Sequence, residues 1–203
     1  ERDGIATWLK NRQRFGNIYF GRDYMSEADA VFAKAGARKV ADGNVAKQAA
    51  KLIADGRILG THLGATEYGP RALGSRTIMA APGDRRINDW LNQRLDRTEF
   101  MPFAPVVRGE RARDVFELPE SLMYTARYMT VTCDVKPEWR DRIPAVVHVD
   151  GTARPQVIWR EHNPTYYDIL AEYETLTGIP VTINTSFNVH EEPIINRPDE
   201  AWI

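Results

Sequence analysis

The chain has 203 residues, of which 43% are hydrophobic and 27% charged, and its formal net charge is −1. These values describe one globular domain and exclude collagen-like, low-complexity and disordered proteins. The single cysteine excludes a disulfide framework and a thiolate-rich metal cluster, and the lack of a long apolar stretch excludes a membrane span. With no signal-peptide pattern at the N-terminus we expect a cytoplasmic protein with no membrane contact, and the near-zero charge argues against nucleic acid as a partner.

The first quarter of the sequence predicts an arm followed by two helices. Residues 1–25 show no clear periodicity and suit a linker or a leading arm, so the domain itself is assigned to residues 26–203. Ser26 is followed by acidic residues, and this pattern predicts that it is the N-cap of a short helix. A second helix is predicted over residues 45–54, between a polar capping residue and a glycine.

A glycine-rich loop separates the next two predicted strands. Residues 57–62 predict a short buried strand, and four glycines crowd the loop after it, which suits close backbone approach or positive φ. Residues 77–81 predict the second strand. Asp84 is expected to cap a helix that runs to about Leu95. The apolar face of that helix is expected to consist of Ile87, Trp90, Leu91 and Leu95.

Strands dominate the next predictions. The apolar run at 100–107 contains two prolines, which favours an edge strand or an extended segment. Alternation of apolar residues predicts strands over 128–135 and 143–149, and a short apolar strand is predicted over 180–183. Because strands and helices are intermixed, the sequence indicates an α/β or α+β protein with helices packed on a sheet.

The clearest helix signal precedes the last strand. Asn163 is expected to be its N-cap, Pro164 its first residue, and Gly178 the residue just past its end. Its predicted buried stripe consists of Tyr166, Leu170, Tyr173 and Leu176.

The loop at 69–76 is the most unusual segment. Its two glycines have the spacing of a phosphate-binding P-loop, but Ser75 stands where that motif needs lysine and a strand is predicted to follow, so we reject a P-loop. What remains is a turn that presents Arg71 and Arg76, with Glu67 near enough to orient one of them. Guanidinium groups bind phosphate or carboxylate with two donors. An anion site and a plain surface loop are both open at this point.

Three small polar side chains follow the last predicted strand. In an extended chain Asn184, Ser186 and Asn188 point to one side. Polar side chains that converge at the end of a buried strand are typical of ligand sites in α/β sheets. The alternative is an Asx or Ser turn, in which these side chains bond their own backbone.

Another candidate cluster ends the predicted strand at 143–149. His148 and Asp150 would share a face, and Arg154 lies past a glycine turn that can return it to the sheet edge. Two potential ligands do not make a metal site, so no metal is assigned, and a hydrogen-bonded structural histidine is the alternative. Cys133 lies in a strand pattern and is interpreted as core packing.

Four segments resemble the C-terminal, YrdC-like domain of the O-carbamoyltransferases, the family of nodulation and antibiotic-tailoring carbamoyltransferases. The resemblance implies a YrdC-like twisted, open mixed sheet with packed helices. It also implies a larger, covalently linked N-terminal domain of the actin-like ATPase fold, where the acceptor and any transition metal would bind. The segments, in the family's order over about residues 45–203, are Glu67–Arg76, Phe103–Pro105, His148–Arg154, and Asn184–Asn188 with Glu192-Pro193.

The resemblance implies a reaction in three steps. Carbamoyl phosphate is hydrolysed to carbamate, ATP adenylates the carbamate to carbamoyl-adenylate with release of pyrophosphate, and the carbamoyl group passes to a hydroxyl acceptor. Mg²⁺ is expected to accompany ATP. The implied catalytic residues are Arg71, Arg154 and His148. The implied ligand-binding residues are Arg71, Arg76, Arg154, Asn184, Ser186, Asn188 and Asp150, with Ser186 and Asn188 as the family's Ser-x-Asn motif.

Two departures from the family pattern stand out. Ser75 and Thr77 occupy positions that are often Asn and Ser, which is a mild change. Glu191 stands where glycine is expected before the Glu-Pro pair, and if that position needs positive φ the side chain costs about 1 kcal/mol or more.

Two other functions remain open, an RNA-binding YrdC-like module and a non-catalytic docking domain.

Overall fold

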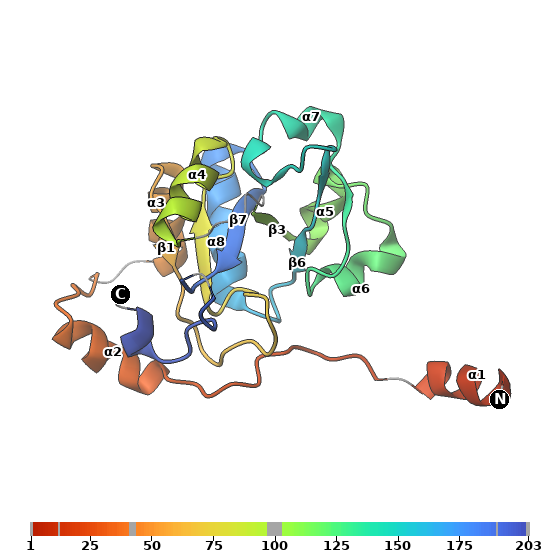
Figure 1. Ribbon diagram of the computed structural model, residues 1–203, viewed down its shortest axis with the longest axis horizontal. Coiled ribbons are helices and arrows are strands. Elements are labelled where there is room, and N and C mark those ends of the chain that lie inside the picture. Colours follow the sequence, from red (N-terminus) through yellow and green to blue (C-terminus); the bar gives the residue numbers. More distant parts are fainter. Residues whose placement is uncertain (1, 12, 41–43, 97–102, 190, 202–203) are drawn as a thin grey trace.

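The computed structural model describes residues 2–11, 13–40, 44–96, 103–189 and 191–201, which form a mixed five-stranded sheet with helices on both faces (Figure 1). In chain order the elements are α1 (Arg2–Asn11), α2 (Met25–Lys34), α3 (Val45–Ala54), β1 (Leu59–Gly60), β2 (Thr77–Ala80), α4 (Arg86–Arg94), β3 (Ala104–Arg108), α5 (Gly109–Val115), η1 (Glu120–Leu122), α6 (Met123–Ala126), β4 (Cys133–Asp134), α7 (Pro137–Arg140), η2 (Pro144–Val146), β5 (Thr152–Ala153), β6 (Gln156–Ile158), α8 (Pro164–Thr177), β7 (Val181–Ser186) and η3 (Pro198–Ala201).

The strand order is β1-β2-β7-β3-β6, so β7 lies at the centre of the sheet. It pairs antiparallel with β2 on one side and with β3 on the other, and β3 pairs parallel with β6. Asn184 of β7 lies opposite Met79 in β2 and Ala104 in β3, and paired residues share one face of a sheet. The mixed α/β sheet with packed helices is therefore confirmed.

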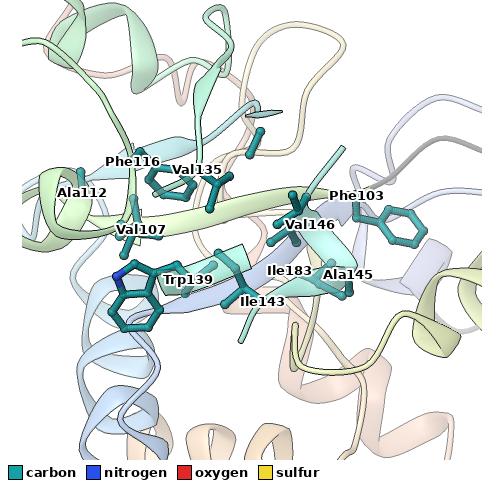
Figure 2. Packing of buried hydrophobic residues seen from close by; sticks show 14 of the residues in the cluster. Phe103, Val107, Ala112, Phe116, Val135, Trp139, Ile143, Ala145, Val146 and Ile183 are labelled. Atoms are coloured by element: carbon teal, nitrogen blue, oxygen red, sulfur yellow. The ribbon is translucent and has the colours of Figure 1, made fainter. Parts of the chain in front are cut away.

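Each face of the sheet has its own apolar cluster. Helices α3 and α8 cover one face, where Ile53 and Leu170 are fully buried beside Met79 and Val106. The other face is covered by α4, α5, α7 and the loops between them. Figure 2 shows Trp139, Ile143 and other side chains of this second cluster gathered around β3 and β7. Because both faces are covered, all of residues 181–184 at the start of β7 are buried, including the polar side chains of Thr182 and Asn184.

Two helices begin and end where the sequence predicts. Helix α3 has Asn44 as its N-cap, and the Asn44 side chain accepts a hydrogen bond from the Lys47 amide at 3.2 Å. Asn163 caps α8 in the same way through the Tyr166 amide at 3.1 Å, and Gly178 ends that helix with a φ of 67°. These caps satisfy backbone groups that a helix end leaves unpaired. The strand predicted over 77–81 is also present as β2.

Several helical predictions are wrong in detail. Ser26 lies inside α2 rather than at its N-cap, because the Asp23 carboxylate already accepts a hydrogen bond from the Met25 amide at 2.8 Å. Helix α1 forms within the segment that showed no clear periodicity. Trp90 and Leu176, assigned to buried stripes, are each 51% exposed, because they lie at the edges of those stripes.

The strand predictions over 128–135 and 143–149 are largely wrong. Only Cys133–Asp134 of the first range is a strand, and Met129 has a φ of 55°, which breaks an extended chain. In the second range Pro144 begins a short 3-10 helix, so no strand precedes His148. The strand predicted over 57–62 is reduced to the two residues of β1.

The segment with two prolines is not an edge strand. Residues 100–102 lie outside the described residues, and β3 is an inner strand between β7 and β6. Pro105 is tolerated there because it precedes the paired region on one side, where the register with β6 begins at Val106. A search of the described helices finds none with the length and apolarity that crossing a bilayer demands.

Candidate functional site

An open cleft of about 600 Å³ lies beside the end of the sheet at which β7 finishes and β6 begins. Its walls come from four separate stretches of sequence: the arm before α2, the glycine-rich loop before β2, the turn after α6, and the link between β5 and β6. The lining residues are Phe15, Ile18, Tyr68, Gly69, Pro70, Arg71, Leu73, Tyr128, Met129, Thr130 and Arg154.

Two arginines face this cleft. Arg71 is exposed, and Arg154 is half-buried with an Nε atom that has no hydrogen-bond partner in the described part of the protein. Burial lowers the pKa of Arg154, and the charge of Arg71 lowers it further. Two like charges held close together, with no carboxylate among the described residues paired to either, favour an anion between them.

Two buried side-chain amides, those of Asn184 and Gln156, hold the loop that lines the cleft. The Asn184 side-chain amide donates to the Ala72 carbonyl at 2.9 Å and to the Gln156 side-chain oxygen at 2.7 Å. Gln156 in turn donates to the Leu73 carbonyl at 2.8 Å. Strands β7 and β6 thereby fix the two residues that follow Arg71. The sequence pattern predicted that Asn184 faces a ligand. Its observed hydrogen bonds instead include one to the Ala72 carbonyl, in the loop that carries Arg71.

Glu67 organises the same loop from beneath. It is 5% exposed, and its Oε1 atom accepts hydrogen bonds from the Leu73 amide at 2.6 Å and the Ser75 amide at 3.1 Å, with a longer contact from the Arg76 amide at 3.3 Å. The carboxylate therefore holds backbone amides, whereas the sequence suggested that it orients an arginine side chain. Gly74 has a φ of 118°, a conformation that L side chains rarely adopt, which allows this tight turn.

Arg76 does not face the cleft. It is fully buried, and its guanidinium donates to the Asn196 carbonyl at 3.0 Å and to the Leu63 carbonyl at 3.1 Å, among other carbonyl oxygens. Burial lowers its pKa, against the charge of Glu67. With its donors occupied by backbone carbonyls, Arg76 is committed to holding loops together, and the cleft contains only two of the three arginines that the sequence grouped.

His148 and Asp150 lie in a tight turn of their own. The His148 Nδ1 atom is 2.9 Å from the Thr152 hydroxyl, which donates to the Asp150 carboxylate at 2.8 Å. Hydrogen bonds from the Thr152 amide and hydroxyl lower the pKa of Asp150. Neither residue is among those that line the cleft, and the turn leads through β5 directly to Arg154.

Ser186 and Asn188 make a second local arrangement at the end of β7. Their side-chain oxygens Oγ and Oδ1 are 2.6 Å apart, and Asn188 donates to the Glu192 carbonyl at 2.6 Å. Glu191 has a φ of 66°, so the position expected to need glycine does adopt the left-handed region. These contacts are of the local turn type, and Asn184 is the member of the motif that bonds to the loop carrying Arg71.

Sequence reasoning missed the aromatic wall of the cleft. Phe15 and Ile18 belong to the arm that was assigned as a linker, and Tyr128 was assigned to a strand. The available signal was the unusual density of aromatic residues in the arm. Within the described ranges no group of three or more His, Cys, Asp or Glu residues could hold a metal ion. Cys133 packs partly buried against the core, and burial raises its pKa to about 11.

Comparison with known proteins identifies one family. The family model described as carbamoyltransferase C-terminus matches residues 50–203. Nodulation protein NolNO of Sinorhizobium fredii is 37% identical over 98% of this chain and 31% of its own length. Nodulation protein U of Rhizobium tropici is 44% identical over 63% of this chain and 21% of its own length. The chain spans about a fifth to a third of the length of the curated relatives that it matches.

A solved structure shares the fold. Full-length HypF, described as being in its phosphate- and nucleotide-bound form, superposes with a TM-score of 0.56 at 20% sequence identity, over 81% of this chain and 20% of the HypF chain. At that level of identity the likeness concerns the arrangement of strands and helices.

Proposed function

The chain belongs to the carbamoyltransferase family, as a C-terminal domain, and from that premise we propose that it binds carbamoyl phosphate and ATP and forms carbamoyl-adenylate. The longer remainder of the family's proteins would then transfer the carbamoyl group to a hydroxyl acceptor. The observation that carries the proposal is the cleft with two arginines, Arg71 and Arg154, that no carboxylate of the described residues neutralises. The phosphate and nucleotide named for the HypF structure fit the same chemistry.

The proposed reaction develops negative charge on phosphate oxygens. Water first converts carbamoyl phosphate to carbamate and inorganic phosphate. A carbamate oxygen then attacks the α-phosphorus of ATP, the bond from that phosphorus to the bridging oxygen breaks, and pyrophosphate leaves. Arg71 and Arg154 would bind the phosphate oxygens and stabilise their charge as this bond breaks. Mg²⁺ would arrive with ATP, with phosphate oxygens and water among its ligands.

In this proposal the other predicted residues either position the two arginines or bind further ligand oxygens. His148 and Asp150 would fix the turn from which Arg154 emerges, since their described contacts lie within that turn. Asn184 would hold the loop bearing Arg71. Ser186 and Asn188 stay proposed ligands for a phosphate or carbamoyl oxygen, on the strength of the family motif. A reaction that consumes ATP favours the cytoplasm as its compartment.

Calorimetry of the 203-residue chain with Mg-ATP and with carbamoyl phosphate tests the proposal. The unmodified chain should bind both ligands. Arg71→Ala and Arg154→Ala should each weaken binding by roughly tenfold or more, because each removes charge-assisted hydrogen bonds. Arg160→Ala is the matched control, since Arg160 is exposed and pairs with Asp168 at 2.9 Å outside the cleft.

If the chain binds neither Mg-ATP nor carbamoyl phosphate, the enzymatic proposal is overturned in favour of a docking domain. Salt-dependent binding of RNA in place of both ligands would instead support the RNA-binding alternative.

A further inference from the structure

The arm, residues 13–24, is bonded to the domain at several points between residues 15 and 21. Figure 1 shows it as an extended segment that runs past the body of the molecule before α2 begins. Phe15 and Ile18 of this arm line the cleft, and Ile18 also packs against the small apolar cluster that contains Leu73 and Met129. The family model covers residues 50–203 and so does not include the arm, although the alignment with nodulation protein NolNO spans 98% of the chain.

Residues 18–21 bond to the wall of the cleft that carries Arg71. The Ile18 carbonyl accepts a hydrogen bond from the Tyr68 amide at 2.8 Å, and the Gly21 amide donates to the Thr66 carbonyl at 3.0 Å. A Cβ atom at Gly21 would lie 2.8 Å from the Thr66 Cβ atom, which shows how closely the two backbones approach.

Residues 15–16 bond to the opposite wall, at the end of α6. The Phe15 amide donates to the Tyr124 hydroxyl at 2.9 Å, and the Phe15 carbonyl accepts from the Tyr128 hydroxyl at 3.2 Å. The Arg127 guanidinium donates to the Gly16 carbonyl. The arm therefore connects two walls that belong to distant parts of the sequence.

Tyr19 makes the contact that bears most directly on Arg71. Its hydroxyl donates to the Leu73 carbonyl at 2.9 Å, and Gln156 donates to the same carbonyl at 2.8 Å, so both acceptor positions of that oxygen are used. Burial and the charge of Glu67 raise the pKa of Tyr19, which keeps the hydroxyl protonated and able to donate. Leu73 is two residues from Arg71, and the strands hold it from one side while Tyr19 holds it from the other.

We propose that residues 15–21 form a strap that completes the cleft, and that Tyr19 is a positioning residue that holds the Arg71 loop in its anion-binding shape. The inference rests on the proposed function only in that Arg71 binds a phosphate group. Inorganic pyrophosphate is therefore the probe, because its binding does not depend on the identity of the substrate.

The test is a double-mutant cycle on the 203-residue chain with pyrophosphate titrated by calorimetry. Tyr19→Phe should weaken binding by roughly threefold to tenfold, the effect of one hydrogen bond. In the Arg71→Ala background the same change should have an effect below about twofold, because Tyr19 acts through Arg71. A general loosening of the fold would weaken both backgrounds alike. Tyr167→Phe is the control, since that hydroxyl bonds Glu110 and lies outside the cleft.

Hydrogen exchange gives a second measurement that needs no ligand. Tyr19→Phe should speed amide exchange over residues 68–76, whereas Tyr167→Phe should leave that segment unchanged. Equal effects in both Arg71 backgrounds, unchanged exchange, or no binding of pyrophosphate would each overturn the inference. Pyrophosphate binding that follows the cycle, without binding of carbamoyl phosphate or ATP, would support the strap and contradict the proposed function.

Discussion

Arg71 and Arg76 lie five positions apart in one loop and have opposite surroundings. Arg71 is exposed at the cleft, whereas Arg76 is fully buried beneath backbone carbonyls that belong to the segments around Leu63 and Asn196. An arginine in a glycine-flanked turn suits either place, because its five donors can satisfy an anion or several carbonyl oxygens. Sequence alone therefore indicated two equivalent arginines, whereas in the structure only Arg71 of the two lines the cleft.

Substitution by lysine should separate the two roles. Arg76→Lys keeps the charge but loses the planar fork, so buried carbonyls are left unpaired and the free energy of unfolding should fall by about 2–3 kcal/mol. Arg71→Lys should change it by less than about 0.5 kcal/mol, as exposed substitutions do. Urea unfolding followed by circular dichroism measures both. Equal losses would show that Arg76 is not the structural member of the pair.

Glu191 shows what a single position can reveal from sequence. The family pattern has glycine at this position, before Glu192-Pro193, and the observed φ of 66° shows that the position does adopt the left-handed conformation. The expectation came from the resemblance to the family, and the side chain of Glu191 bears the strain that glycine would avoid.

At the scale of elements, the capping signals of asparagine and glycine were reliable, whereas the N-cap predicted at Ser26 and the apolar alternation were not. Helices α3 and α8 were predictable because a capping asparagine and a terminal glycine act within one or two turns. The strand prediction at 143–149 failed because that stretch is buried against the sheet without joining it. The prediction at 128–135 failed because Met129 has a φ of 55°, and only Cys133–Asp134 forms a strand, which pairs with β5. An apolar stretch such as Ala145–Val147 records burial, and burial does not distinguish a strand from an irregular segment.

The candidate site was predictable to a similar degree. Arg71, Arg154 and Asn184 were each identified from their local sequence, and the fold brings the first two to one cleft with the third beneath it. Phe15 and Ile18 could not be placed, because their contacts are with residues more than 45 positions away. Proximity of that kind is set by the path of the whole chain.

Packing between the Arg71 loop and α8 gives a further test. A Cβ atom at Gly74 would lie 2.5 Å from the Tyr166 ring, whereas one at Gly56 would meet nothing within 4 Å, although both glycines have positive φ. Gly56→Ala should therefore cost about 1 kcal/mol of backbone strain. Gly74→Ala should cost about 1–3 kcal/mol more, because the ring or the loop must move.

Thermal or urea unfolding of the two glycine variants provides the comparison. Equal destabilisation would mean that the loop can withdraw from α8 freely, in contradiction to the close packing of Gly74 on Tyr166.

For the whole molecule, His62 links global stability to pH. Burial lowers its pKa, and the positive charge of Arg76 lowers it further, while its Nε2 atom lies 3.1 Å from the Asn196 carbonyl. The unfolded chain binds a proton near pH 6.5, whereas folded His62 stays neutral to lower pH. The unfolded state therefore holds more protons in this window, and stability should fall as the pH drops from 7 toward 5.

Urea unfolding at several pH values measures this dependence. His62→Gln should flatten the plot of unfolding free energy against pH, by a slope equivalent to up to about one proton. The glutamine side chain keeps a donor for the Asn196 carbonyl. If the variant shows the same dependence of unfolding free energy on pH, titratable groups other than His62 cause the loss of stability in acid.

The position of β7 has a consequence for how the protein is made. It is the last strand of the described chain and the central strand of the sheet, and β2 and β3 share no ladder without it. During synthesis β1 with β2, and β3 with β6, can therefore form only two separate pairs, each with an unpaired edge where β7 belongs. Asn184 cannot bond Ala72 and Gln156 until β7 has left the ribosome, so the sheet and the candidate site must be completed in the same event.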